Sequence, residues 1–217
     1  MAIDIQDEYS ETIQRNGAIQ FIGSNNRDQF DEMGQEHYEY LIEKGLQSNH
    51  VFLDIGCGAM RTGQHIIPFL NPNNYFGIDR MPELIEFGLN EVLGSEVVFH
   101  KGPKFSVNDN FDCSFVDKPV DVVWCQSLMS HLNEDDIKTC LNKSKEKLAL
   151  GGKIYFTYFQ KGSMSREDSK NQQSHSKKDL QYNQNVMEQI VNECGLQTEF
   201  NGRIGHPRGQ WMYICKV

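Results

Sequence analysis

The sequence predicts an α/β fold, in which a doubly wound and largely parallel sheet is covered by helices on both faces. Segments in which apolar residues recur at helical spacing alternate with short apolar runs. Such runs are typical of strands buried on both faces. They occupy 51–55, 74–79, 120–126 and 153–159, and a further strand with indistinct ends lies within 97–107. At the end of the chain, over 196–217, two strand-like runs flank a loop rich in Gly and Pro, which predicts a hairpin.

In the first half of the chain, apolar spacing and turn residues predict the helices. The polar residues 1–26 are expected to form an N-terminal arm or a short helix, and 27–45 an amphipathic helix that stops at Gly45. The stretch 61–70 is expected to be a helix, because its apolar residues follow helical spacing up to the turn NPNN. Pro82 suits the first turn of the next helix.

In the second half, Asn133 is expected to cap a helix that the pair Gly151-Gly152 ends. The first turn of this helix is the acidic stretch 134–136, which complements the helix dipole. Three neighbouring carboxylates resemble a metal cluster, but a solvated first turn explains them better, and no metal is expected.

Residues 161–178 are almost free of apolar side chains and predict a long surface loop. Ser176 with Asp179 fits a capping box for a helix that ends near Cys194. The length of the whole chain, 1–217, is typical of a single domain.

The composition restricts the partners. Asp and Glu number 30 against 21 Lys and Arg, and the net charge of −9 argues against binding to duplex DNA or to an anionic membrane surface. The six cysteines form no CxxC motif, which favours reduced thiols in a cytoplasmic protein. No leader-like or membrane-spanning apolar run is present. We expect the protein to be a monomer or a homodimer.

A glycine-rich turn follows the first strand and predicts a ligand site, since ligands bind at the carboxyl ends of such strands. Its order is Asp54, then Gly56 and Gly58, and Asp79 ends the second strand, where an acid typically accepts hydrogen bonds from ribose hydroxyls. The third glycine of a dinucleotide fingerprint is replaced by Arg61, and no P-loop lysine follows. Asp54 would repel a pyrophosphate but attract an ammonium or a sulfonium group. S-adenosylmethionine carries both cations and no phosphate.

Five segments extend this interpretation to a family. They are FLDIGCGAMRTG, YFGIDRM, FSVNDNF, VDVVWCQSLMSHL and LALGGKIYFTYF, in that order. Together they resemble the motifs of class I S-adenosylmethionine-dependent methyltransferases, and over about 20–217 the chain is similar to a small bacterial subset with a terminal GHPRGQ loop. The resemblance implies a seven-stranded Rossmann-like sheet whose last strand is antiparallel. Many members carry a third glycine where Met60 stands, and Met60 is not expected to bind the cofactor.

The resemblance also implies roles for the residues at the strand ends. Asp54 would lie near the methionyl amino group, Gly56 and Gly58 would leave room for the cofactor, and Asp79 would hold the ribose. Other residues would flank the adenine, accept from its amino group, or close the methionine side. The expected cofactor-binding residues are Asp54, Gly56, Cys57, Gly58, Arg61, Asp79, Arg80, Met81, Asn108, Asp109, Phe111 and Gln126.

The residues that would bind the methyl acceptor are less distinct. His131 is a candidate general base or acceptor contact, although it also suits a role in fixing its loop. Arg208, with His206, is a candidate clamp for an anionic group, and a simple turn is the alternative. Tyr158 and the loop 161–178 follow the fifth strand, where family members place substrate lids. Five Lys and Arg against two acids in this loop favour an anionic small molecule, and a solvated loop without a role is the alternative.

Several functions remain compatible with these patterns. The leading prediction is a methyltransferase that acts on a small-molecule acceptor. A protein or RNA methyltransferase and a non-catalytic S-adenosylmethionine-binding regulator are the alternatives that keep the cofactor. A nicotinamide-dependent oxidoreductase is disfavoured, because it needs a turn that cradles phosphates.

Overall fold

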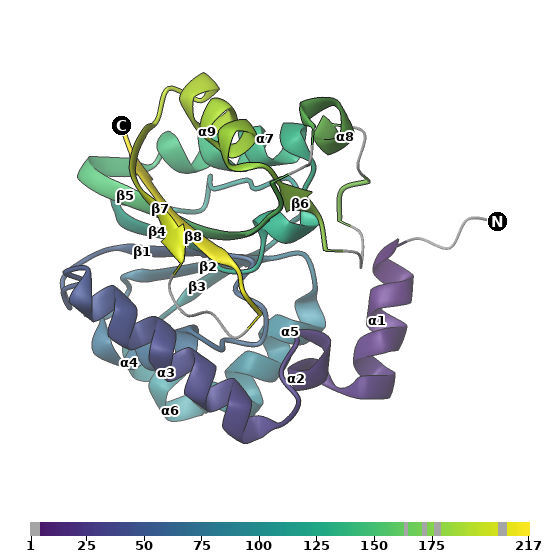
Figure 1. The fold of residues 1–217 in the computed structure, drawn as a ribbon. Coiled ribbons are helices and arrows are strands. Elements are labelled where there is room, and N and C mark those ends of the chain that lie inside the picture. Colours follow the sequence, from purple (N-terminus) through teal and green to yellow (C-terminus); the bar gives the residue numbers. More distant parts are fainter. Residues whose placement is uncertain (1–4, 163–164, 171–172, 176–178, 204–207) are drawn as a thin grey trace. The chain divides into compact units, whose positions relative to one another are not determined.

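A computed structural model of the chain describes residues 5–162, 165–170, 173–175, 179–203 and 208–217 (Figure 1). Contacts within the chain divide it into two compact units, residues 1–109 and 110–217. The expected substrate site His206 and the expected helix cap Ser176 lie outside the described residues.

The first unit is built on three parallel strands in the order β3-β2-β1. Asp54 on β1 pairs with Gly77 on β2, and Asp79, the last residue of β2, pairs with Val107 on β3. The carboxyl ends of the three strands therefore meet at one edge, which is where the predicted ligand residues begin. The strands are β1 (Phe52–Ile55), β2 (Tyr75–Asp79) and β3 (Lys104–Val107).

The helices of the first unit lie on one side of these strands (Figure 1), and two of them begin at residues that favour a helix start. Asn26 caps α3 by accepting a hydrogen bond from the backbone N–H of Gln29, and Pro82 occupies the first turn of α5, as predicted. A π-helical segment extends α5. The helices are α1 (Ile5–Asn16), α2 (Ala18–Phe21), α3 (Arg27–Glu43), α4 (Gly63–Phe69), α5 (Pro82–Phe87), the π-helix Gly88–Leu93 and α6 (Ser95–Lys101).

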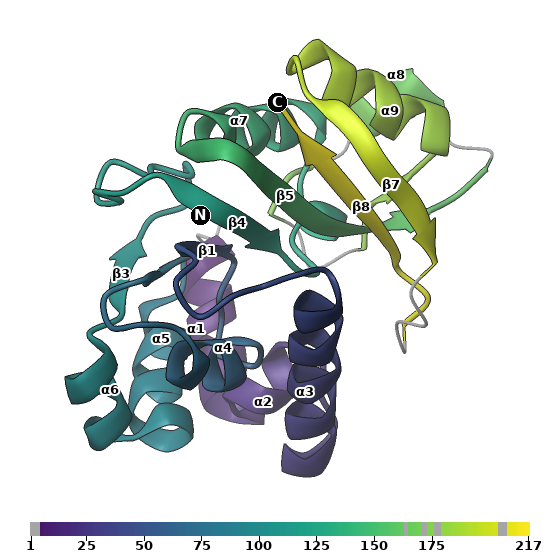
Figure 2. The same ribbon diagram turned by 90° about the vertical axis from the view of Figure 1, so that its left-hand side faces the viewer.

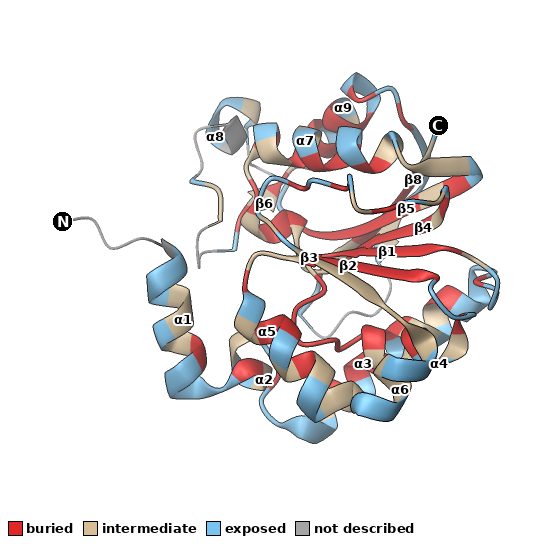
Figure 3. Ribbon diagram, turned by 180° about the vertical axis from the view of Figure 1, so that it is seen from behind, coloured by how far each residue is buried: buried red, intermediate tan, exposed pale blue. Residues whose placement is uncertain are grey.

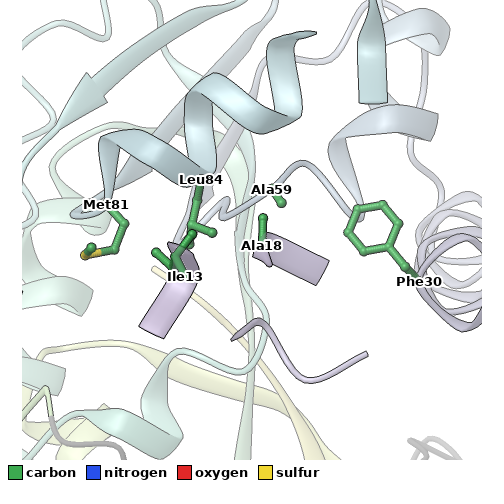
Figure 4. Close-up of a cluster of buried hydrophobic side chains, with 6 residues drawn as sticks. All are labelled: Ile13, Ala18, Phe30, Ala59, Met81 and Leu84. Carbon is green, nitrogen blue, oxygen red and sulfur yellow. The ribbon is translucent and has the colours of Figure 1, made fainter. Parts of the chain in front are cut away.

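The N-terminal helices pack on the glycine-rich turn and on α5. Figure 4 shows Ile13 of α1 directed toward Leu84 of α5, and Ala18 of α2 beside Ala59 of the turn. Gln6 and Ser10 of α1 hydrogen-bond to residues 80 and 83. The N-terminal segment is thus part of the first unit's core.

The second unit has a mixed sheet in the order β4-β5-β8-β7 (Figure 2), and the short β6 pairs with β5. β4 and β6 run parallel to β5, while β8 runs antiparallel to both β5 and β7. The strands are β4 (Val120–Cys125), β5 (Leu148–Gln160), β6 (Gln181–Tyr182), β7 (Gln197–Arg203) and β8 (Trp211–Lys216). Helix α7 packs on β5 and α9 on β7; the helices are the 3-10 turn Met129–His131, α7 (Glu134–Lys145), α8 (Arg166–Lys170) and α9 (Gln184–Glu193).

The α/β class, the mostly parallel Rossmann-like sheet and the antiparallel closing strand are confirmed, since the terminal hairpin inserts β8 between β5 and β7. Strand burial follows this arrangement: β1, β2, β4 and most of β8 are buried, whereas β3 is partly exposed (Figure 3). Strand β7 is mostly exposed. No described helix is both long and apolar enough to cross a bilayer.

Three predictions about the elements are wrong. The segment 161–178, predicted as a loop, contains the helix α8. The pair Gly151-Gly152 does not end α7, which stops at Lys145, but lies within β5. A side chain at Gly152 would meet the carbonyl oxygen of Val120 at 2.6 Å, so the glycine permits close approach of β4 and is no helix stop. The last helix, expected to follow a cap at Ser176, starts later, because β6 occupies 181–182 and Asn183 is the cap of α9.

Candidate functional site

The turn after β1 contains two residues in the left-handed region of backbone conformation, and it is hydrogen-bonded to β2. Gly56 and Gly58 have φ values of 78° and 53°, which glycine adopts without strain. The backbone N–H groups of Gly56 and Cys57 both donate to the carbonyl oxygen of Ile78, at 2.7 and 3.0 Å. Cys57 is buried between the glycines. The turn is therefore fixed by β2 as well as by its own glycines.

Met60 stands at the position where many proteins of the family that the sequence resembles carry a third glycine. Its φ is 64°, in the left-handed region that disfavours most side chains, and its side chain is fully buried. A glycine at this position would relieve the backbone, while the methionine fills the space beneath the turn.

Asp79 ties the turn to the end of β2. Its Oδ2 accepts a hydrogen bond from the Gly58 N–H at 2.8 Å, and its Oδ1 accepts from the Met81 N–H at 2.9 Å. Burial raises the pKa of Asp79, and the N–H donors of Met81 and Gly58 offset part of that rise. A carboxylate has about four acceptor sites, so the group keeps acceptor capacity for a ribose hydroxyl.

Asp54 is more deeply enclosed than its sequence position indicates. Its side chain is 3% exposed, and the hydroxyl of Tyr75 donates to its Oδ2 at 2.7 Å. Burial raises the pKa of Asp54 to about 7; the Tyr75 hydrogen bond lowers it, Asp79 raises it and Arg61 lowers it. At neutral pH the carboxyl is therefore close to its titration midpoint. Tyr75 has no motif around it that marks its role.

Arg61 faces the N-terminal segment. Its Nη1 donates to the carbonyl oxygen of Ile22 at 3.2 Å and to the Ser24 hydroxyl at 3.3 Å. A side chain at Gly58 would lie 3.5 Å from the Ile22 methyl group, so the residues after α2 approach the glycine turn closely. The cofactor role expected for Arg61 stays a prediction.

The other expected cofactor residues of the first unit lie around the same strand ends. The Arg80 guanidinium sits 5.5 Å from the centre of the Tyr9 ring, and Met81 is buried in the core shown in Figure 4. The Asn108 N–H donates to the carbonyl oxygen of Asp79 at 3.2 Å, so Asn108 lies beside the acid that is expected to bind the ribose. Asp109 is exposed.

The expected residues of the second unit lie at and after the end of β4, or in the segment that precedes it. Gln126 directly follows β4 and is half-buried. Phe111 is buried with a φ of 58°, and its ring stacks on His175 with centres 6.3 Å apart. His131 ends the 3-10 turn, and its carbonyl oxygen accepts from the His175 N–H at 2.6 Å. The described part of the loop 161–178 is thus bonded to the segment after β4.

A buried polar network fixes the residue after Gln126. The Thr157 hydroxyl accepts from the Ser127 N–H and donates to the Gln210 side-chain oxygen, both at 2.7 Å. The Gln210 amide in turn donates to the Ser127 hydroxyl at 2.8 Å, and Ser127 holds a φ of 59°. Sequence reasoning missed this network, although Gln210 closes the GHPRGQ loop that was singled out.

We expect Gln210→Leu to lower the free energy of unfolding by ~1–2 kcal/mol, because the buried Thr157 hydroxyl and the half-buried Ser127 hydroxyl both lose a partner. Denaturant unfolding measures the loss. Gln197→Leu, on the exposed face of β7, is the matched control and should change stability little. Equal effects of the two variants would contradict a structural role for the network.

Tyr158 and Arg208 have partners within the second unit. Tyr158 is fully buried on β5, and its hydroxyl donates to the Asn201 side chain at 3.1 Å. Arg208 donates to Asp179 at 2.8 Å and lies 5.3 Å from the centre of the Phe159 ring. Their acceptor roles stay predictions; for Arg208, an acceptor anion would have to displace or join Asp179.

An ion-pair cluster anchors α8. The Glu134 carboxylate, whose side chain is fully buried, accepts from Arg166 at 2.7 Å and from Lys138 at 2.8 Å. Glu193 of α9 pairs with the same two cations at 2.6 Å. The acidic first turn of α7 is therefore partly buried and paired, and not wholly solvated. In the described parts of the chain, no group of three His, Cys, Asp or Glu is arranged to hold a metal ion.

We expect Glu134→Gln to cost ~1–2 kcal/mol of unfolding free energy at pH 7, since two partly exposed cations lose a buried anion. Hydrogen bonds from Lys138 and Arg166 lower the pKa of Glu193 to about 2, and the pKa of Glu134 also lies below the usual 4.5. Both shifts stabilise the folded state above about pH 4.5, and the stabilisation is lost as the pH falls toward 2. The difference between wild type and variant, followed by denaturant unfolding, should therefore shrink below pH 4.5. Asp135→Asn, on the exposed side of the same turn, should show no such dependence.

Comparisons with known proteins agree with this geometry. A family described as a methyltransferase domain matches residues 53–154, which run from β1 into β5. The fold is similar to that of magnesium protoporphyrin IX methyltransferase (ChlM) from Synechocystis PCC 6803, with a TM-score of 0.68 and 13% identity over 99% of this chain and 97% of that one.

Two further structures show the same fold. An S-adenosylmethionine-dependent methyltransferase from Clostridium acetobutylicum ATCC 824 has a TM-score of 0.65 and 12% identity over 99% of both chains. A TehB-like S-adenosylmethionine-dependent methyltransferase from Corynebacterium glutamicum ATCC 13032 Kitasato has a TM-score of 0.61 and 15% identity over 97% of this chain and 98% of that one. Residues 53–154 thus match a methyltransferase-domain family, and the chain has the α/β fold of several S-adenosylmethionine-dependent methyltransferases.

Proposed function

We propose that the chain transfers the methyl group of S-adenosylmethionine to a small-molecule acceptor, and that its first unit holds the cofactor. The observation that carries this proposal is the pair of acids at the ends of β1 and β2, with the bare glycine turn between them. Gly58 leaves open the space that a side chain would fill beside Ile22, and Asp79 keeps acceptor capacity for a ribose hydroxyl. These residues fit a nucleoside with a cationic amino-acid end.

The residues of the chain would position and shield the reactants. S-adenosylmethionine, when bound, supplies a methyl group on a positively charged sulfur. Methyl transfer needs the acceptor atom held in line with that carbon and kept from water, so orientation supplies much of the rate enhancement. In this proposal Asp79 binds the ribose, Asp54 binds the amino group, and Gln126 closes the methionine side.

His131 is the proposed base where the acceptor must lose a proton. Its place at the end of the 3-10 turn puts it a few residues after the carboxyl end of β4. The hydrogen bond from the His175 N–H to its carbonyl oxygen holds its backbone in place. A positioned histidine is the side chain that most often acts as a general base.

The class of acceptor rests on two observations. A protein of similar fold, magnesium protoporphyrin IX methyltransferase, is named for a small molecule. The segment 161–178, which includes α8, carries five Lys and Arg against two acids in an otherwise acidic chain. Arg166 is paired with Glu134 and Glu193, and the remaining positive charge favours an anionic acceptor.

The test is methyl transfer from labelled S-adenosylmethionine into a cell extract separated into metabolite, protein and RNA fractions. We expect the label in the metabolite fraction, bound to a compound retained by an anion exchanger. Label in protein or RNA alone would contradict the acceptor class. Calorimetry with S-adenosylhomocysteine and with NAD checks the cofactor separately, and binding of NAD alone would contradict the cofactor site.

A further inference from the structure

The hydroxyl of Tyr75 is held in one place by aromatic packing. Its ring, which is buried, stacks on Phe52 with centres 5.9 Å apart and an interplanar angle of 9°, and Phe105 lies against it at 5.9 Å. These neighbours come from β1 and β3, so the ring is enclosed by both strands that flank β2. The hydroxyl reaches Asp54 Oδ2 at 2.7 Å and therefore fixes that carboxyl group as well.

The other ionisable groups around Asp54 shift its pKa in opposite directions. Asp79, at the end of β2, raises its pKa, and Arg61, in the turn after β1, lowers it. The Cys57 thiol lies in the same turn, where burial and the two aspartates raise the pKa of this thiol, so it stays neutral. With burial as the largest cause, the pKa of Asp54 is about 7, and the Tyr75 hydroxyl is the largest influence that favours the carboxylate.

We propose that Tyr75 is a positioning residue of the cofactor site, which orients the buried Asp54 and favours its carboxylate, and that binding of an ammonium group at Asp54 displaces the proton that part of the free molecules carry there. This inference rests on the proposed function, in which Asp54 receives the methionyl amino group. In the free protein near pH 7 a part of the molecules carries the neutral acid. When the ammonium group binds, the acid loses its proton to the buffer, the ammonium keeps its three protons, and no covalent bond to carbon changes.

The direction of the pH dependence follows from this proton release. Below pH 7 the protein must give up a proton to bind, so the affinity falls as the pH falls, by at most about tenfold per pH unit. The dependence belongs to the amino-acid part of the ligand. 5′-Methylthioadenosine has the same nucleoside and sulfur but no amino group, and its affinity should not vary in this way.

The experiment is calorimetry of S-adenosylhomocysteine and of 5′-methylthioadenosine between pH 5.5 and 7.5, in pairs of buffers with different ionisation enthalpies. For the wild type we expect release of a fraction of a proton with the first ligand and none with the second. In Tyr75→Phe the midpoint should move to higher pH, and the affinity for S-adenosylhomocysteine at pH 7 should fall by about 3- to 10-fold. The affinity for 5′-methylthioadenosine should be retained. Tyr213→Phe, which removes a buried hydroxyl paired with Thr198, is the matched control and should behave as wild type.

Asp54→Asn gives a second readout if Tyr75→Phe does not fold. It should bind S-adenosylhomocysteine more weakly, without proton release and with no dependence on pH in this range. Binding by the wild type without proton release, or an unchanged pH profile in either variant, would overturn the role of Tyr75 and leave the proposed function intact. Failure of the wild type to bind S-adenosylhomocysteine at all would overturn both.

Discussion

Replacing Asp79 with alanine is expected to lower the affinity for S-adenosylhomocysteine by about 5- to 150-fold, that is by ~1–3 kcal/mol. The carboxylate does two things in the structure: it accepts from the N–H groups of Gly58 and Met81, and it keeps acceptor capacity for a ribose hydroxyl. Alanine leaves both N–H groups and the ribose without an acceptor. Calorimetry gives the change in affinity, and denaturant unfolding of the free protein gives the part that comes from the turn.

Asp79→Asn separates the two contributions. Asparagine keeps the size of the side chain and one acceptor oxygen, so one backbone N–H remains bonded while the other loses its partner. We expect a smaller loss of stability than with alanine but a clear loss of affinity, because the amide nitrogen cannot accept. Asp28→Ala, at an exposed position in the first turn of α3, is the control for removal of an acid from the same unit. Wild-type affinity in Asp79→Ala would remove the ribose role.

The strands and the glycine turn were predictable because their signals are local. Buried parallel strands appear as continuous apolar runs, and Gly56 and Gly58 stand where the backbone needs a positive φ. The acid at the end of β2 was also predictable from its distance along the chain. The hydrogen bond that Asp79 accepts from the Gly58 N–H was not predictable, because Gly58 follows a different strand.

The partners of the acids were hidden for the same reason. Tyr75 appears in the sequence as an ordinary aromatic residue at the start of a buried strand, and only the parallel register of β1 and β2 brings its hydroxyl to Asp54. The premise that Asp54 is simply an anion therefore needed revision: burial puts its pKa near 7.

Boundaries failed where tertiary contacts overrode local preference. Gly152 was interpreted as a helix stop, yet its lack of a side chain serves the approach of β4 to β5. Arg208 is a different case: its role as an acceptor clamp stays a prediction, and the partner that the structure gives it, Asp179, lies 29 residues away in sequence. In both cases the neighbour in space comes from a distant part of the chain, which local sequence patterns do not reveal.

Replacing Gly34 with alanine is expected to have the largest effect on stability, a loss of about 3 kcal/mol. Alanine favours helices over glycine by about 1 kcal/mol, so helix propensity alone predicts that the variant is more stable. In the structure, however, a side-chain carbon at Gly34 would lie 2.1 Å from the carbonyl oxygen of Arg61, a backbone atom that cannot rotate away. Either α3 or the segment after the glycine turn must shift.

The direction of that shift connects the helix to the cofactor site. Arg61 follows the glycine turn by three residues and is bonded to Ile22 and Ser24, so displacing its backbone should disturb Gly58 and weaken S-adenosylhomocysteine binding as well. Glu36→Ala, on the exposed face of α3, makes the control substitution without the overlap and should leave stability and affinity close to wild type. Denaturant unfolding and calorimetry on both variants distinguish steric contact from helix propensity. A Gly34→Ala protein that is more stable than wild type would show that the helix moves freely against the turn, because propensity would then outweigh the contact.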